Sequence, residues 1–147
     1  MDFKNISKTL SDSKGVPMQI LSPDDRLLYA REVDGKWELT TEETEFPCEL
    51  MMVGQDSKEF RERKKEMFGN RSSKSRRAMK FEDAEHEAIE TVAAAVVGMH
   101  YVVWDGAILD HSTANLFQFL DEYRPAFEQA NIYIADRSNF FQSASNP

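Results

Sequence analysis

Residues 53–61, Val-Gly-Gln-Asp-Ser-Lys-Glu-Phe-Arg, mark the position at which the character of the chain changes. Gly54 is suited to end a strand, and residues 55–57 carry side-chain oxygens that can accept hydrogen bonds from the free N–H groups of a following helix. Glu59 lies three residues after Asp56, which is the spacing of a capping box. We therefore expect a strand to end here and a helix, capped by Asp56, to begin.

The segment before this junction has the pattern of a small antiparallel sheet. Within residues 16–53, short apolar runs alternate with turn residues, and the runs cover residues 18–21, 27–30, 37–40 and 48–53. Asp34-Gly35 separates two of these runs and favours a tight hairpin, because both central positions of a type I′ turn need a positive φ. We expect three or four strands here, and a second tight turn at Asp105-Gly106.

The segment after the junction has the spacing of helices. A first helix should end near Gly69, where a left-handed backbone costs little. A second helix over residues 80–97 has apolar residues at intervals of three and four and should end at Gly98. Ser112 is a good N-cap for a third helix. Pro125 opens a fourth, at a first-turn position that needs no N–H.

Together these segments predict one α+β domain over residues 1–141, with a β-rich part over residues 16–53 and three to four packed helices over residues 57–141. Residues 142–147 should be disordered. Residues 1–15 are polar and are compatible with a short helix or a mobile segment; their apolar anchors are Phe3, Ile6 and Leu10.

Composition places the chain among globular proteins. The 147 residues are 41% hydrophobic and 30% charged, which suits one domain with one principal core. The longest strongly apolar stretch, residues 93–104, falls short of the roughly 20 residues that a membrane helix needs. Cys48 is the only cysteine, so no internal disulfide can form. We expect a cytoplasmic protein that binds no membrane.

The net charge of −8 is distributed unevenly. Residues 61–80 carry nine Lys or Arg against two Glu, a local net charge of +7, which leaves −15 on the rest of the chain. Such a run can be a solvated surface, or it can bind an acidic protein surface on another copy or a client. Binding to nucleic acid is disfavoured, because the pI is about 4.9 and no aromatic residue lies within residues 71–80. The candidate contact residues are Arg71, Lys74, Arg76 and Arg77.

The sequence carries little that predicts catalysis. It contains no P-loop, GxSxG or GxGxxG pattern. Asp83 and His86 are spaced like the carboxylate–histidine pairs of helical di-iron sites, but such sites need that pair twice. We therefore expect neither an enzyme nor a bound metal or cofactor.

The junction motif resembles a strand-to-helix signature, Gly-x-Asp-Ser-x-Glu-aromatic-Arg, of tail assembly chaperones from long-tailed, siphovirus-type bacteriophages. In this chain the signature consists of Gly54, Asp56, Ser57, Glu59, Phe60 and Arg61. The order of the later motifs is similar to the same family, and the resemblance covers residues 51–141. These motifs contain Gly98, Asp105, Gly106, Ser112, Asn115 and Phe140. The family tryptophan that follows the helix-closing glycine is displaced here to Trp104.

The resemblance implies a function in assembly. Members of this family bind the tape measure protein, keep it soluble and recruit major tail tube subunits in the host cytoplasm, and they are absent from the mature virion. The resemblance also implies self-association and, in many members, a second form extended by ribosomal frameshifting.

Such a role needs exposed apolar surface on a highly charged protein. Trp104, Phe140 and Phe141 are candidate contact residues. The alternative is a small structural or adaptor protein of a phage particle, or a regulatory protein-binding module.

Overall fold

The computed structural model describes residues 2–12, 14–68 and 81–145 and has the predicted α+β class. The elements in chain order are α1 (Phe3–Ser11), β1 (Val16–Gln19), β2 (Tyr29–Val33), β3 (Lys36–Thr40), β4 (Glu49–Met52), α2 (Lys58–Phe68), α4 (Phe81–Ala94), β5 (Val96–His100), β6 (Val103–Trp104), β7 (Ala107–Ile108), α5 (Thr113–Glu122), α6 (Arg124–Ala135) and α7 (Ser138–Ser145).

The central sheet is antiparallel and has the strand order β1-β4-β5. Strand β4 lies in the middle, where Leu50 and Met52 are fully buried. Strand β5 comes from the segment after α4, so the expectation that the sheet lies wholly within residues 16–53 is wrong. The second helix also ends at Ala94 rather than at Gly98, which lies in β5 opposite Met51. Residues 95–97, Ala-Val-Val, include two β-branched side chains that favour a strand once a pairing partner is present.

Both predicted Asp-Gly turns are confirmed. Asp34 and Gly35 join β2 to β3 with φ of 52° and 80°, and Asp105 and Gly106 join β6 to β7 with φ of 54° and 81°. Each hairpin is a two-stranded sheet separate from the central one, so residues 16–53 do not form a single sheet. The two hairpins meet where the Trp37 N–H donates to the Gly106 carbonyl oxygen at 2.9 Å.

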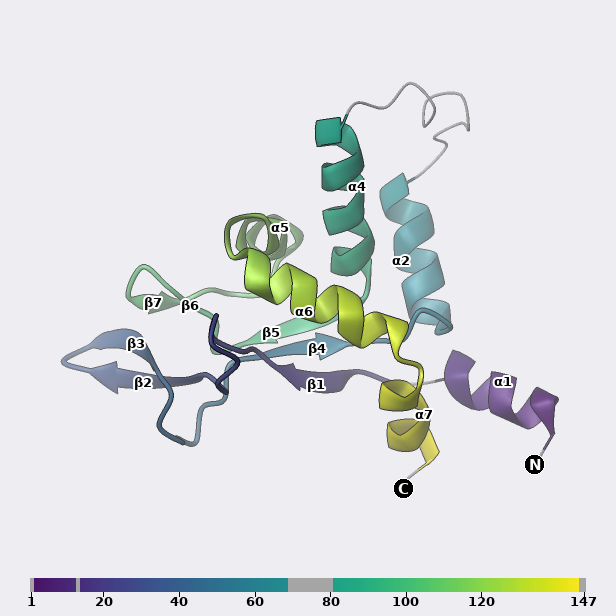
Figure 1. Cartoon of the computed structure of the whole chain (residues 1–147), viewed down its shortest axis with the longest axis horizontal. Helices are drawn as coiled ribbons and strands as arrows, with labels where there is room; N and C mark the ends of the chain where they lie inside the picture. The colour runs from purple at the N-terminus through teal and green to yellow at the C-terminus, as the bar shows by residue number, and fades with distance from the viewer. Residues whose placement is uncertain (1, 13, 69–80, 146–147) are drawn as a thin grey trace.

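Helices α4, α5 and α6 pack together on one side of the central sheet (Figure 1). Ser112 caps α5 by accepting a hydrogen bond from the Asn115 N–H at 3.0 Å, as predicted, and Pro125 lies in the first turn of α6, also as predicted. Leu116 and Leu120 of α5 are fully buried in the core.

The chain forms short helices near both ends. The first residues form α1, whose N-cap Asp2 accepts a hydrogen bond from the Asn5 N–H at 2.9 Å. Disorder is expected from residue 142, and in the structure α7 continues to Ser145. Helix α7 is anchored by Phe140, which is 1% exposed and lies edge-on to Tyr133. Phe140 therefore belongs to the core and is not a contact residue.

Candidate interaction site

The β4–α2 junction is built differently from the sequence expectation. The cap of α2 is Ser57, whose buried Oγ accepts a hydrogen bond from the Phe60 N–H at 3.0 Å. Asp56, predicted as the cap, instead accepts two hydrogen bonds from the Arg137 guanidinium, at 2.7 and 3.3 Å. These bonds raise the pKa of Arg137. Asp56 thus ties the start of α2 to the residue before α7, because Ser57 already occupies the capping position.

The signature residues are mainly structural in this fold. Phe60 is 6% exposed in the core. A Cβ at Gly54 would lie 2.9 Å from Cγ of Phe140, so the backbone at this position passes directly against the Phe140 ring. Glu59 is exposed in the first turn of α2, where the helix dipole favours a carboxylate.

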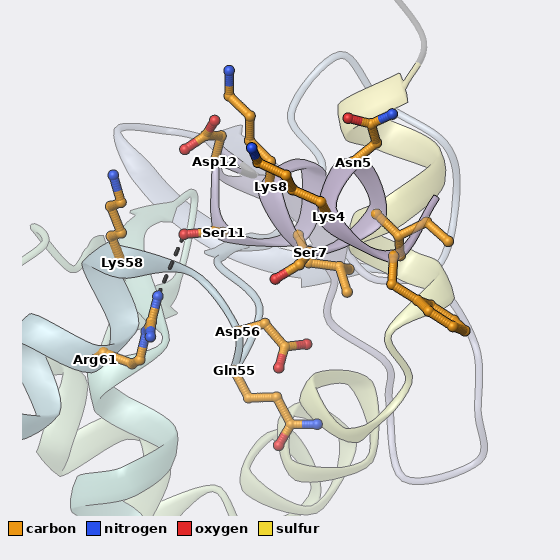
Figure 2. A pocket seen from close by; sticks show the side chains of 13 residues that line it. Lys4, Asn5, Ser7, Lys8, Ser11, Asp12, Gln55, Asp56, Lys58 and Arg61 are labelled. Carbon is orange, nitrogen blue, oxygen red and sulfur yellow. Dashed lines mark hydrogen bonds between the residues drawn. The ribbon is translucent and has the colours of Figure 1, made fainter. Parts of the chain in front are cut away.

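A groove runs between α1 and the start of α2, and we call it the α1 groove (Figure 2). Its volume is about 920 Å³. Arg61 reaches across it toward Ser11, with 3.4 Å between Nη2 and Oγ. The groove is lined by Phe3, Lys4, Asn5, Ile6, Ser7, Lys8, Leu10, Ser11, Asp12, Gln55, Asp56, Lys58 and Arg61.

Helix α1 carries a row of apolar side chains that it does not bury. Phe3, Ile6 and Leu10 are spaced by three and four residues, so they share one side of the helix. None of the helix residues is buried, and the Phe3 side chain is 89% exposed. Helix α1 contacts α7, and this contact leaves Phe3 exposed and Ile6 and Leu10 partly exposed toward the groove.

The rim of the α1 groove is positively charged. Four bases, Lys4, Lys8, Lys58 and Arg61, line it against two acids, and one of these acids, Asp56, already pairs with Arg137. In the view of Figure 2, Lys8 and Lys58 extend to the same side, one from each wall. A second, shallower hollow continues along α2 and is lined by Lys58, Arg61, Glu62 and Lys65.

The remaining predicted site residues do not gather at this groove. Gly98, Asp105 and Gly106 lie in β5 and the β6–β7 turn, and Ser112 and Asn115 form the start of α5. Trp104 is half-buried with its ring edge-on to Phe119, and Phe141 is half-buried in α7. Arg71, Lys74, Arg76 and Arg77 lie outside the described residues.

Sequence reasoning missed the part of the groove formed by α1. It recognised Phe3, Ile6 and Leu10 as apolar anchors but assigned them no contact role. Their spacing of three and four residues is the helical period and was the available signal. That the fold would leave Phe3 exposed and the other two only partly buried could not be read from the pattern.

Chemical sites elsewhere in the described residues are sparse. Burial raises the pKa of the Cys48 thiol to about 12, which keeps the thiol protonated and poorly nucleophilic. His86 interacts with Glu90 at 2.9 Å and lies against the Phe117 ring. Within residues 2–12, 14–68 and 81–145, no group of three or more His, Cys, Asp or Glu is placed to hold a metal ion. None of the helices in the same residues combines the length and apolarity needed to cross a membrane.

Comparison with known proteins adds no relative: no family model, curated protein or solved structure matches this chain.

Proposed function

We propose that this chain is a tail assembly chaperone of a long-tailed bacteriophage. In this role it binds the tape measure protein, keeps it soluble and helps to recruit major tail tube subunits. The ordered motifs over residues 51–141 support this proposal through their resemblance to that family. The structure adds a surface that suits the role.

The observation that carries the proposal is the apolar row of α1. A monomeric protein gains no stability from an apolar side chain that is 89% exposed, as Phe3 is. Burying such a side chain against another protein contributes about 1.5–3 kcal/mol. The row therefore suits a partner that brings apolar surface of its own.

The shape and charge of the α1 groove suit an amphipathic helix as its ligand. Helix-in-groove recognition places apolar anchors of the ligand at helical spacing against an apolar floor, while charges at the rim fix its orientation. Here Phe3, Ile6 and Leu10 supply the apolar part, and Lys4 and Lys58 supply charge at the rim. A long helical client could be coated by many copies that each bind one short stretch.

The test is co-expression with the tape measure protein of the same phage. We expect Phe3→Ser combined with Ile6→Ser to lower the amount of co-purified tape measure protein at least about tenfold, since two buried apolar contacts are lost. Ile132→Ser is the matched control, because Ile132 is 73% exposed on α6 and lines a different hollow. Equal losses from both variants would remove the α1 groove from the mechanism.

A second measurement separates the chaperone from the alternative of a particle component. We expect mass spectrometry of purified virions to detect tail tube and tape measure proteins without this chain. Stoichiometric amounts of the chain in finished particles would contradict the proposal and favour a structural or adaptor protein.

A further inference from the structure

The α1 groove and the β2–β3 hairpin lie at opposite ends of the long axis of the molecule (Figure 1). The hairpin and the loop after it, residues 31–45, form what we call the acidic end. It carries six carboxylates against two bases, a net charge of −4. All of these charged side chains are exposed. One of the two bases, Arg31, is engaged within the acidic end by Glu38 at 2.6 Å and lies 4.0 Å from Glu42.

The two ends are complementary in charge and in apolar content. The α1 groove has an excess of bases at its rim, and the acidic end has an excess of carboxylates. The hairpin tip also presents Val33, which is 46% exposed beside the Asp34-Gly35 turn. A narrow two-residue turn with one apolar side chain and flanking acids matches a groove lined by both apolar side chains and bases.

We infer that the α1 groove receives the acidic end of a second copy of this chain. The hairpin of one molecule does not reach its own groove, because the two lie at opposite ends of the long axis of the molecule. The contact is therefore heterologous. Contacts of this kind generate open chains of subunits unless the rotation between copies happens to close a ring.

This contact also covers the apolar row of α1 when no client is bound. An exposed apolar surface on a free protein promotes non-specific association. A neighbouring copy held mainly by charge would shield that surface and could be displaced by a longer apolar client. This covering role rests on the proposed function, whereas the contact between copies does not.

Charge-reversed variants provide the test. In the groove variant, Lys4→Glu and Lys58→Glu place acids in the first turns of α1 and α2, where the helix dipoles favour them. In the tip variant, Glu32→Lys is combined with Asp34→Asn, and Asn-Gly keeps the type I′ turn. The matched control is Glu122→Lys with Glu128→Gln, two exposed sites on α5 and α6 that give the same charge change as the tip variant.

We expect the average mass of the wild-type chain, measured by sedimentation velocity at low salt without any client, to rise with concentration and to fall when salt is added. The groove and tip variants should each need at least about tenfold higher concentration to associate. In the groove variant acids then face the acidic end, and in the tip variant the net charge of the acidic end falls from −4 to −1. The control variant should behave like the wild type. An equimolar mixture of groove and tip variants should form pairs, because the unchanged groove of the tip variant still meets the unchanged acidic end of the groove variant.

Three results would overturn the inference: a wild-type chain that stays monomeric, reversed variants that associate like the wild type, or a mixture that remains monomeric. If a reversed variant unfolds, Lys4→Gln with Lys58→Gln and Glu32→Gln with Asp34→Asn replace the two pairs, and either should weaken association relative to the control. Co-purification with the tape measure protein is scored separately. If the chain binds the tape measure protein but never self-associates, only the contact between copies is refuted. If the chain self-associates but does not bind that protein, only the proposed chaperone function is refuted.

Discussion

The β4–α2 junction and helix α1 form the two sides of one groove, yet they treat their apolar side chains in opposite ways. The junction buries Phe60 at 6% exposure and packs Gly54 against the ring of Phe140, whereas α1 leaves Phe3 89% exposed. The recognisable motif therefore lies where packing is most demanding. The most exposed apolar side chain of the groove lies on the helix that carries no motif. A sequence signature can thus report how a site is supported rather than where it binds.

The largest effect should come from removing the anchor between the two sides. Phe140→Ala deletes a ring that is 1% exposed and packs against both Gly54 and Tyr133. We expect a loss of about 3–5 kcal/mol in the free energy of urea unfolding, from lost burial and the cavity left behind. Phe141→Ala, at a half-buried neighbouring position, is the control and should cost clearly less. Equal losses would mean that α7 is not anchored through Phe140.

Gly54→Ala tests the same contact between Gly54 and Phe140 by adding an atom instead of removing a ring. The added Cβ would lie 2.9 Å from Cγ of Phe140, so either the ring or the backbone must move. Overpacking of this kind costs about 1–3 kcal/mol, measurable by thermal or urea unfolding. Gly54→Ala combined with Phe140→Leu should lose less than the sum of the two single changes, because the smaller side chain makes room. Strict additivity would contradict the contact.

The next comparison is between two neighbouring polar residues at the start of α2. Ser57→Ala removes a cap whose Oγ is buried and leaves the Phe60 N–H without its acceptor, so we expect a loss of about 1–2 kcal/mol. Asp56→Ala removes only the exposed pair with Arg137 and should destabilise the protein less. Unfolding in urea measures both. A larger loss for Asp56→Ala would restore Asp56 as the residue that holds the junction.

The sequence predicted the features that depend on local chemistry. The Asp34-Gly35 and Asp105-Gly106 turns, the Ser112 cap and the Pro125 helix start all follow from the residue's own backbone preference or side chain, and all are found in the structure. The sequence did not predict that residues 96–100 form a strand of the central sheet. These residues, β5, pair with β4, which is distant in sequence. A local sequence pattern carries no information about a pairing strand that is distant in the chain.

The same limit explains the errors at the candidate site. Three consecutive polar residues, 55–57, all have capping chemistry, and only the surrounding fold selects Ser57 over Asp56. The burial of Phe140 depends on the gap left by Gly54, which lies more than eighty positions away in the chain. Phe3, Ile6 and Leu10 have a core-like spacing, but α1 packs mainly against α7 at the edge of the fold, which leaves Ile6 and Leu10 partly buried and Phe3 exposed.

The smallest expected effect on stability is the one that separates the two sides of the groove most clearly. Phe3→Ser changes a large apolar side chain that the isolated protein barely buries, so the free energy of unfolding should shift by no more than about 0.5 kcal/mol. Phe60→Ser, in the core beneath the start of α2, should destabilise the protein severely because it buries a hydroxyl in place of a ring. Urea unfolding of the two variants measures the contrast directly. If Phe3→Ser lowered the free energy of unfolding substantially in the isolated chain, the apolar row of α1 would stabilise the fold. The α1 groove would then not be a surface available to a partner.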